Sequence, residues 1–223
     1  MFEQKSEQPD GLESEPTKGI PGQAASELWG FAPVAARGAF HLMEAAGADA
    51  HAQLQQFIGE QFRTHFAAEV PDDTPRLLGA FGPDGDVLAV FGIRTRADGF
   101  FSEHYLGMGL ETALLNRTGE RFDGSRVVEV SHFAIAGRRA FAGIVPLMAE
   151  GLSRLGFEHV VCTATRCLVR YFSRRYLTPL ILTEARAADL PEDQRARWGS
   201  YYLADPAVAF GPLAPALARE PRH

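Results

Sequence analysis

The chain has 223 residues, of which 46% are hydrophobic and 22% are charged, and this predicts one sizeable globular domain with room for a small appendage. The net charge of -6 argues against a nucleic-acid-binding domain, which usually has a basic excess, although a local basic patch runs from Arg166 to Arg175. No run of about 18 apolar residues is present, so the sequence predicts no transmembrane helix.

The N-terminal region divides into two parts. Residues 1–25 are rich in Glu, Ser, Pro and Gly, which predicts a disordered tail. Residues 26–43 are mildly amphipathic, but Pro33 and Gly38 interrupt the pattern and predict short helical pieces at best. We expect residues 26–50 to form either a strap packed on the domain or a lid over a lipid-like substrate. The domain itself is expected over residues 51–212, followed by a C-terminal tail at 213–223.

The first elements of the domain have clear periodicity. Residues 51–68 place Leu54, Ile58 and Phe62 on one helical face, and two prolines end this helix. A β-hairpin follows at 76–81 and 87–96, joined by the turn residues 82–85. Residues 100–105 are expected to be extended. We expect the remaining helices at 107–117, 139–155, 166–176 and 191–196, and the remaining strands at 127–135, 159–163 and 179–183, with short strands or loops at 201–203 and 207–210.

This order of elements indicates the fold class. A hairpin leading into strand–helix–strand units predicts an α+β protein with three layers. The central sheet should be mixed and mostly antiparallel, with helices on both faces.

The segment from Val127 to Met148 carries the clearest chemistry. Its strand is apolar except for Glu129 and His132, and an unpaired carboxylate there would be costly. The turn that follows brings Arg138 and Arg139 to a helix N-terminus, where anions bind. A base beside a phosphate cradle suggests group transfer from a phosphate-bearing donor. The alternatives are a Glu129 that pairs with an arginine to fix the sheet, and arginines that are solvated at a helix start.

Spacing alone leaves the role of His132 open. On a regular strand, residues three apart face opposite sides, so His132 and Glu129 would lie on different faces. A β-bulge would change this. His132 is therefore either a surface-packed histidine or a second base.

Four short segments in order resemble the thermostable hemolysin family. They are FSEHYL (101–106), VEVSHFAI (128–135), VCTATR (161–166) and WGSYY (198–202). The resemblance implies a fold akin to GCN5-related acyltransferases. The strand around Glu129, Ser131 and Phe133 is also similar to one in acyl-homoserine-lactone and N-acyl amino acid synthases, although His132 replaces the arginine of that pattern. The family name records a haemolysis phenotype and does not establish a pore.

The resemblance implies an N-acyltransferase that uses an acyl carrier protein or acyl-CoA as donor and an amine, such as an amino acid, as acceptor. Glu129 would be the general base, since apolar surroundings raise a carboxyl pKa, and His132 a possible second base. Backbone groups of Phe133, Ala134 and Ile135, with Ser131, would contact the thioester and its pantetheine arm.

The turn before the second long helix departs from the acetyltransferase pattern. Gly143 remains, but Ala142 and Ile144 stand where small glycine-type residues are expected. This departure weakens the prediction of coenzyme A. It leaves room for an acyl carrier protein, whose phosphate and acidic surface would suit Arg138 and Arg139, and the choice between the two donors stays open.

The remaining candidate residues lie in the C-terminal half and in the FSEHYL segment. Thr163 and Arg166 end a strand and begin a helix, which is where ligands collect in open sheets. Tyr171 is one residue away from the position at which acetyltransferases place a tyrosine, where this chain has Phe172. Tyr105 matches the family without an independent mechanism. Trp198 and the two tyrosines at 201–202 either line an acyl tunnel or cover the core.

Other classes of site find little support in the sequence. The two cysteines, Cys162 and Cys167, imply no disulfide framework, and together with the absence of a signal peptide they suggest the cytoplasm. No metal-ligand spacing or dinucleotide fingerprint is present, so we expect no metal and no tightly bound cofactor beyond the acyl-phosphopantetheine donor. A membrane-active protein, or a silent fold that binds lipid or a protein partner, is the alternative, and membrane association stays open.

Overall fold

The computed structural model describes residues 30–137, 141–176 and 178–218. These residues form an eight-stranded sheet in the order β1-β2-β3-β4-β5-β6-β8-β7. Neighbouring strands run antiparallel except for β5 and β6, which are parallel, so the sheet is mixed and mostly antiparallel as predicted. The strands are β1 (Phe31–Arg37), β2 (Phe40–Ala45), β3 (Arg76–Phe81), β4 (Val87–Arg94), β5 (Val127–Ile135), β6 (His159–Ala164), β7 (Leu180–Glu184) and β8 (Ala207–Pro212).

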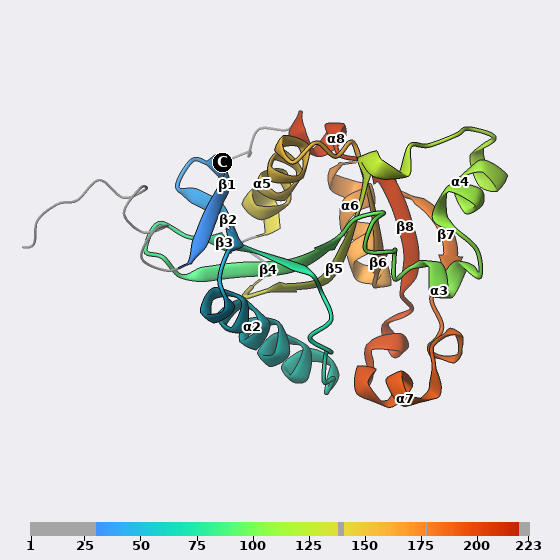
Figure 1. Ribbon diagram of the computed structural model, residues 1–223, viewed down its shortest axis with the longest axis horizontal. Coiled ribbons are helices and arrows are strands. Elements are labelled where there is room, and N and C mark those ends of the chain that lie inside the picture. Colours follow the sequence, from blue (N-terminus) through green and yellow to red (C-terminus); the bar gives the residue numbers. More distant parts are fainter. Residues whose placement is uncertain (1–29, 138–140, 177, 219–223) are drawn as a thin grey trace, which may run out of the picture.

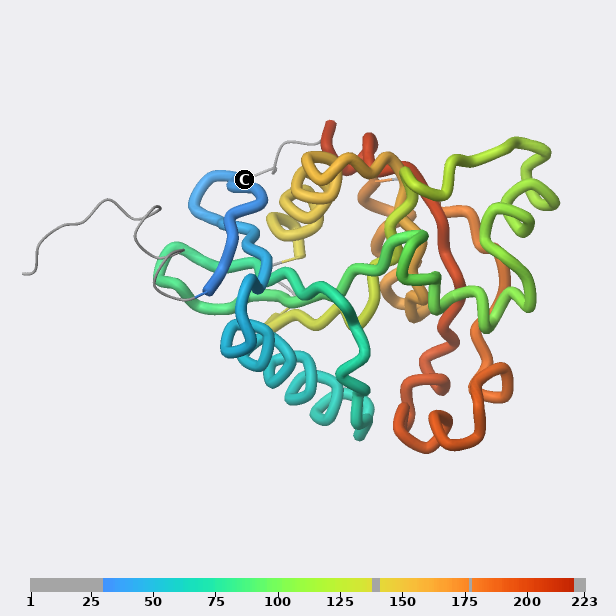
Figure 2. Tube along the Cα trace, viewed as in Figure 1, coloured from blue at the N-terminus to red at the C-terminus, as the bar shows by residue number. Residues whose placement is uncertain are grey.

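Helices cover both faces of the sheet (Figure 1), which confirms the predicted α+β class. One face carries α2 (Ala48–Phe66), α3 (Glu103–Leu106) and α4 (Leu110–Thr118). The other face carries α5 (Phe141–Arg154), α6 (Arg166–Arg175) and α8 (Ala214–Leu217). The link between β7 and β8 contains α7 (Glu192–Arg195) and short 3-10 turns, and it folds toward the side of α2 (Figure 2).

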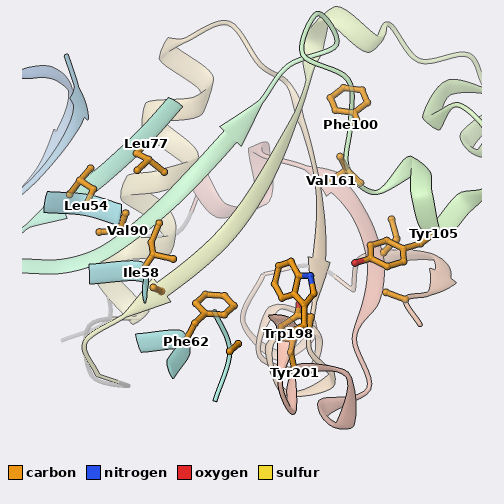
Figure 3. Close-up of a cluster of buried hydrophobic side chains, with 14 of the residues drawn as sticks. Leu54, Ile58, Phe62, Leu77, Val90, Phe100, Tyr105, Val161, Trp198 and Tyr201 are labelled. Atoms are coloured by element: carbon orange, nitrogen blue, oxygen red, sulfur yellow. The ribbon is translucent and has the colours of Figure 1, made fainter. Parts of the chain in front are cut away.

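The periodicity of α2 explains its position. Leu54, Ile58 and Phe62 recur every four residues, and all three are buried against the sheet. The helix ends where Ala67 adopts a left-handed conformation with φ of 50°. Figure 3 shows these side chains packed with Leu77 and Val90, so the predicted helix supplies one of the two hydrophobic cores.

The prediction of helical pieces within residues 26–43 is wrong for the part that the structure describes. Those residues form the β1–β2 hairpin, whose turn is made by Gly38 with φ of 60°. Pro33, which argued against a long helix, sits at a register shift in the edge strand, where a missing N–H is tolerated. Leu42 is fully buried and β2 pairs with β3, so tertiary pairing decides the conformation.

The segment expected to be extended at 100–105 is also different. Its second half is the short helix α3, and residues 201–204, expected as strand or loop, form a 3-10 turn. The boundaries of the tail, strap and domain remain a prediction.

The sheet splits between β5 and β6. Their parallel pairing joins Val127–Val130 to His159–Cys162 and goes no further among the described residues. Beyond this point β5 continues to pair with β4 alone, and Figure 1 shows these two strands leading away from β6 and β8. The backbone edge of β5 from Ser131 to Ile135 therefore faces the split.

A β-bulge lies at this split. Val90 pairs with Ala134 and Gly92 with Ser131, so Phe91 alone stands opposite His132 and Phe133. His132 takes a positive φ of 50°, which is uncommon for a residue with a side chain. The extra residue resets the alternation, and His132 joins Glu129 on the face covered by α2.

Candidate functional site

A cavity of about 1030 Å³ opens where β5 separates from β6. Its lining comes from both faces of the sheet, so it passes through the split. We call the part under α2 the α2-side chamber, lined by Phe62, Phe66, Asp73, Arg94, Glu129, His132, Trp198 and Tyr201. We call the part under α5 and α6 the α5-side chamber, lined by Phe133, Phe141, Val145, Met148, Leu152, Val160, Cys162, Tyr171, Leu213 and Ala216.

Glu129 lies at the inner end of the α2-side chamber and is only 2% exposed. Its Oε2 accepts a hydrogen bond from the backbone N–H of Phe101 (2.5 Å), and its Oε1 accepts one from Ser102 (2.8 Å). Burial raises the pKa of the carboxyl, and the two backbone hydrogen bonds oppose that shift. Glu129 thus fixes the chain that enters α3 and also presents a carboxyl group to the cavity.

His132 lies on the same face and is held from two sides. Its Nδ1 is 2.8 Å from Thr74 Oγ1, and its ring stacks on Trp198 with centroids 5.8 Å apart. Burial lowers the pKa of His132 to about 4, so the imidazole is neutral at pH 7. Nε2 has no hydrogen-bond partner among the described residues and is available to a ligand.

The contact between Thr74 and His132 depends on a glycine. A Cβ at Gly92 would collide with the Thr74 side chain and would lie 2.9 Å from Ser131 Oγ. The absence of a side chain at Gly92 lets the loop before β3 approach the bulge. Thr74 therefore reaches His132 because Gly92 leaves room for it.

Three buried hydroxyl groups in the cavity wall lack a partner among the described residues. They are Ser131 Oγ, Thr163 Oγ1 and Tyr171 OH. Each unsatisfied buried polar group costs about 1–3 kcal/mol. Buried hydroxyl groups without a protein partner that converge on one cavity are a feature of ligand-binding sites.

The α5-side chamber is almost wholly apolar. The rings of Phe133 and Phe141 pack edge to face with centroids 5.6 Å apart. The ring of Tyr171 packs against Phe141 with centroids 5.0 Å apart. Burial raises the pKa of the Cys162 thiol to about 12, so this cysteine is a wall residue with no thiolate character. The chamber suits a flexible hydrocarbon.

Arginines of α6 border the cavity on its solvent side. Arg170, Arg174 and Arg175 line it, and none has an ion-pair partner among the described residues. Arg166, Arg170 and Arg174 recur every four residues and so share one helical face. A chain with net charge -6 therefore displays a basic stripe beside the cavity.

Most of the predicted site residues meet in this cavity. Those that line it are Tyr105, Glu129, Ser131, His132, Phe133, Ala134, Ile135, Thr163 and Tyr171. Tyr105 bonds through its hydroxyl to that of Tyr202 at 2.7 Å, and burial raises its pKa, so it acts as a neutral wall residue.

Other predicted residues are not brought to the cavity. Gly143 packs against Phe40, because a Cβ there would be 3.1 Å from that ring. Arg166 pairs with Asp205 at 3.0 Å and lines a separate pocket of about 460 Å³. Arg138 and Arg139 lie outside the described residues, so the predicted phosphate contact there stays a prediction.

Sequence reasoning missed Asp73, Thr74 and Arg94. All three are polar, but they occur in a loop and at a strand end, without a recognisable spacing relative to Glu129. The one available signal was the run Asp72–Thr74 directly before a strand. Trp198 was expected either to line a tunnel or to cover the core. It is 7% exposed and belongs to the hydrophobic core, and it also lines the cavity.

Two other kinds of site are not found in the described part of the chain. It contains no helix that is both long and apolar enough to cross a membrane. It also contains no group of three or more histidine, cysteine or acidic side chains placed to hold a metal ion.

Comparison with solved structures relates this geometry to known folds. FeeM, an N-acyl amino acid synthase from uncultured soil microbes, is similar with a TM-score of 0.54 and 10% identity, over 79% of this chain and 92% of that one. The acyl-homoserine-lactone synthase LasI is similar with a TM-score of 0.52 and 15% identity, over 82% of this chain and 98% of that one. The C-terminal condensation domain of Ebony, solved with beta-alanyl-dopamine, has a TM-score of 0.50 and 9% identity, over 78% of this chain and 98% of that one.

These similarities show the fold, which is that of the GCN5-related acyltransferases. No curated protein sequence matches the chain significantly. A family model described as thermostable hemolysin matches residues 45–217 and so spans most of the sequence, including both chambers. The chain therefore belongs to the thermostable hemolysin family.

Proposed function

We propose that this protein is an N-acyltransferase that moves an acyl group from a phosphopantetheine thioester to an amine, such as an amino acid. The observation that carries the proposal is the cavity that crosses the sheet at the split. It joins an apolar chamber to a chamber with Glu129 and a neutral His132. Amide formation from a thioester needs a place for an acyl chain and a place for a deprotonated amine, with the reacting carbon between them.

The donor has a defined position in this proposal. The acyl chain occupies the α5-side chamber, and the pantetheine arm lies along the open edge of β5 from Ser131 to Ile135. Amides of the arm pair with that edge in the manner of an added strand. Ser131 and Thr163, whose buried hydroxyls lack partners, hydrogen-bond the polar atoms near the thioester.

The chemistry follows from the groups on the α2 side. The amine nitrogen attacks the thioester carbonyl, a C–N bond forms and the C–S bond breaks. His132 Nε2 takes the proton that the nitrogen loses, since the ring is neutral and Thr74 holds its other nitrogen. The thiolate leaves on the α6 side, where the buried Tyr171 hydroxyl can supply a proton.

Glu129 has a different part in this scheme. Both of its oxygens already accept backbone hydrogen bonds, so we assign it first to positioning α3 and the cavity wall. This division modifies the sequence-based expectation, in which Glu129 was the first candidate for the base.

The α6 stripe favours an acyl carrier protein as donor. Its unpaired arginines border the cavity, and a carrier protein brings an acidic surface as well as one phosphate. Coenzyme A would satisfy the same arginines with its phosphates, so the two donors must be compared directly.

The test is incubation of the purified protein with acyl-CoA and acyl-carrier-protein donors and a mixture of amines. Mass spectrometry for new amides and a thiol reagent for released thiol give two readouts. We expect amide and thiol in equal amounts, with a higher kcat/KM for the carrier protein. Replacing Arg170 and Arg174 together by Glu should raise the KM for the carrier-protein donor about tenfold.

The matched control for that pair is Arg117→Glu with Arg121→Glu, which changes the charge equally but away from the cavity. Binding of acyl donor with no amide and no thiol release would contradict the enzyme and favour a lipid-binding protein, for which the apolar chamber is also suited. An equal rise in the KM for the carrier-protein donor in both double variants would contradict docking of the carrier protein on the arginines of α6.

A further inference from the structure

The mouth of the α2-side chamber carries a pair of opposite charges that the chemistry above does not use. Arg94 Nη2 is 3.3 Å from Asp73 Oδ1, and both residues line the cavity. Arg94 stands opposite Glu129 in the β4–β5 register, and Asp73 directly precedes Thr74, which bonds to His132. The pair therefore lies next to the proposed base.

The two members of the pair differ in how they are held. Arg94 Nη2 also donates to the backbone carbonyl of Asp73 at 2.5 Å, and the Arg94 side chain is only 15% exposed. The Asp73 carboxylate is 43% exposed and has no other partner among the described residues. The guanidinium is thus fixed in the wall, while the carboxylate can turn toward a ligand.

Apart from Glu129 and His132, the rest of the chamber lining is aromatic. The ring centroid of Trp198 is 5.4 Å from that of Tyr201 and 6.3 Å from that of Phe62. The centroids of Phe66 and Tyr201 are 5.2 Å apart. Figure 3 shows Phe62, Trp198 and Tyr201 gathered between α2 and the turns before β8. These side chains come from two segments far apart in the sequence, and they line the same cavity as the charged pair.

We propose that the α2-side chamber binds an α-amino acid with an aromatic side chain as a zwitterion, with its carboxylate on Arg94 and its ammonium on Asp73. A simple amine would leave Arg94 without its anion, and a fatty acid would leave Asp73 without its cation. Adjacent charges of opposite sign on one wall match the two charges of an amino acid. The ring of the acceptor packs against Phe62, Trp198 and Tyr201.

This placement also brings the nitrogen to the correct side of the sheet. An ammonium on Asp73 lies beside His132. It loses one proton to the solvent that reaches the half-exposed Asp73 and so becomes the nucleophilic amine, and His132 takes the second proton as the C–N bond forms. The inference rests on the proposed acyl transfer, and it specifies the acceptor that the sequence left undefined.

The experiment compares L-phenylalanine with phenethylamine, which has the same ring and amine but no carboxylate. With the wild-type protein and one acyl donor, we expect kcat/KM for L-phenylalanine to exceed that for phenethylamine by roughly 10- to 100-fold, the range for a charge-assisted hydrogen-bonded pair. Arg94→Met should reduce this ratio to near one. The control Arg117→Met, at an exposed position of α4 that does not line the cavity, should keep it.

Two further acceptors test the aromatic wall and the carboxylate of Asp73. L-Alanine should be acylated at least tenfold less efficiently than L-phenylalanine, because it leaves the ring space empty. Asp73→Asn should lower kcat/KM for both L-phenylalanine and phenethylamine, since both contain the ammonium group that Asp73 binds.

Calorimetric binding of L-phenylalanine in the absence of donor separates this inference from the proposed function. Binding that Arg94→Met abolishes, without any amide product, would contradict the transferase and support the amino-acid site. Acylation of phenethylamine as efficient as that of L-phenylalanine would overturn the amino-acid site and leave the transferase standing. If L-phenylalanine neither binds nor reacts, the inference is wrong.

Discussion

The two halves of β5 have the same apolar character in sequence but different surroundings in space. Val127–Val130 pairs with β6 along its whole length, and its Glu129 and Val130 also pair with β4. The oxygens of Glu129 are occupied by backbone amides. Ser131–Ile135 is paired on one side, contains the bulge and exposes His132 to the cavity. The first half therefore maintains the fold, while the second half carries the proposed base, although both contain a titratable group.

The largest effect should come from removing the imidazole in the second half. Asn tolerates positive φ better than most residues, so His132→Asn preserves the backbone of the bulge and removes the proposed base. We expect kcat/KM for amide formation to fall by about 10²–10⁴-fold, the usual contribution of a general base. The melting temperature should change little, and activity within threefold of wild type would remove His132 from the mechanism.

The converse change in the first half tests its structural role. Glu129→Gln keeps one acceptor oxygen but turns an NH₂ group toward the backbone N–H of Phe101 or Ser102. We expect the free energy of unfolding to fall by about 1–3 kcal/mol, measured by denaturant titration. A variant as stable as wild type but inactive would reverse the comparison and make Glu129 the base.

A subtler change sharpens the assignment of His132. Thr74→Val has nearly the same shape and removes only the hydroxyl that bonds to Nδ1. The ring then loses its fixed orientation, and kcat should fall about tenfold while the KM for the donor stays the same. Thr112→Val, an exposed position on α4, is the matched control. Equal kcat for Thr74→Val and wild type would mean that the hydrogen bond does not orient the ring.

The last prediction concerns pH. The pKa of His132 is about 4 when folded and 6.5 in the unfolded chain, so between these values the unfolded state binds more protons. His132 therefore stabilises the fold above about pH 6.5, and this contribution is lost as pH falls toward 4. The difference in unfolding free energy between wild type and His132→Asn should shift in this window, and a pH-independent difference would show that His132 is not shielded from water.

The elements with strong local patterns were predicted well from the sequence. The helix at α2, the β3–β4 hairpin, β5 and α5 follow from periodicity and turn residues, and all are present. The β1–β2 hairpin was missed because Pro33 and Gly38 disrupt a helical pattern as readily as they mark a hairpin, and only pairing with β3 separates the two. Likewise α3 forms where Glu129 accepts the backbone amides of Phe101 and Ser102, a partner 27 residues or more away.

The candidate site was predicted in part for the same reason. Glu129 and His132 were found because they are polar residues within one apolar strand, and Ser131 was found through the resemblance of that strand to one in acyl-homoserine-lactone synthases. Asp73, Thr74 and Arg94 were missed because they reach the cavity from a loop and from a neighbouring strand. Sequence spacing contains no information about that approach, which depends on the space left by Gly92.

The sequence alone determined that the chain builds an α+β sheet with helices on both faces and that one strand carries unusual polar residues, because hydrophobic periodicity is a local property. Only the tertiary structure decided which of those residues meet. The bulge at His132 and the end of β5–β6 pairing at Val130 place the imidazole in hydrogen-bond contact with Thr74, near the Asp73–Arg94 pair, and in the same cavity as Glu129. These are consequences of strand register and of the close approach of distant segments, which no single stretch of sequence specifies.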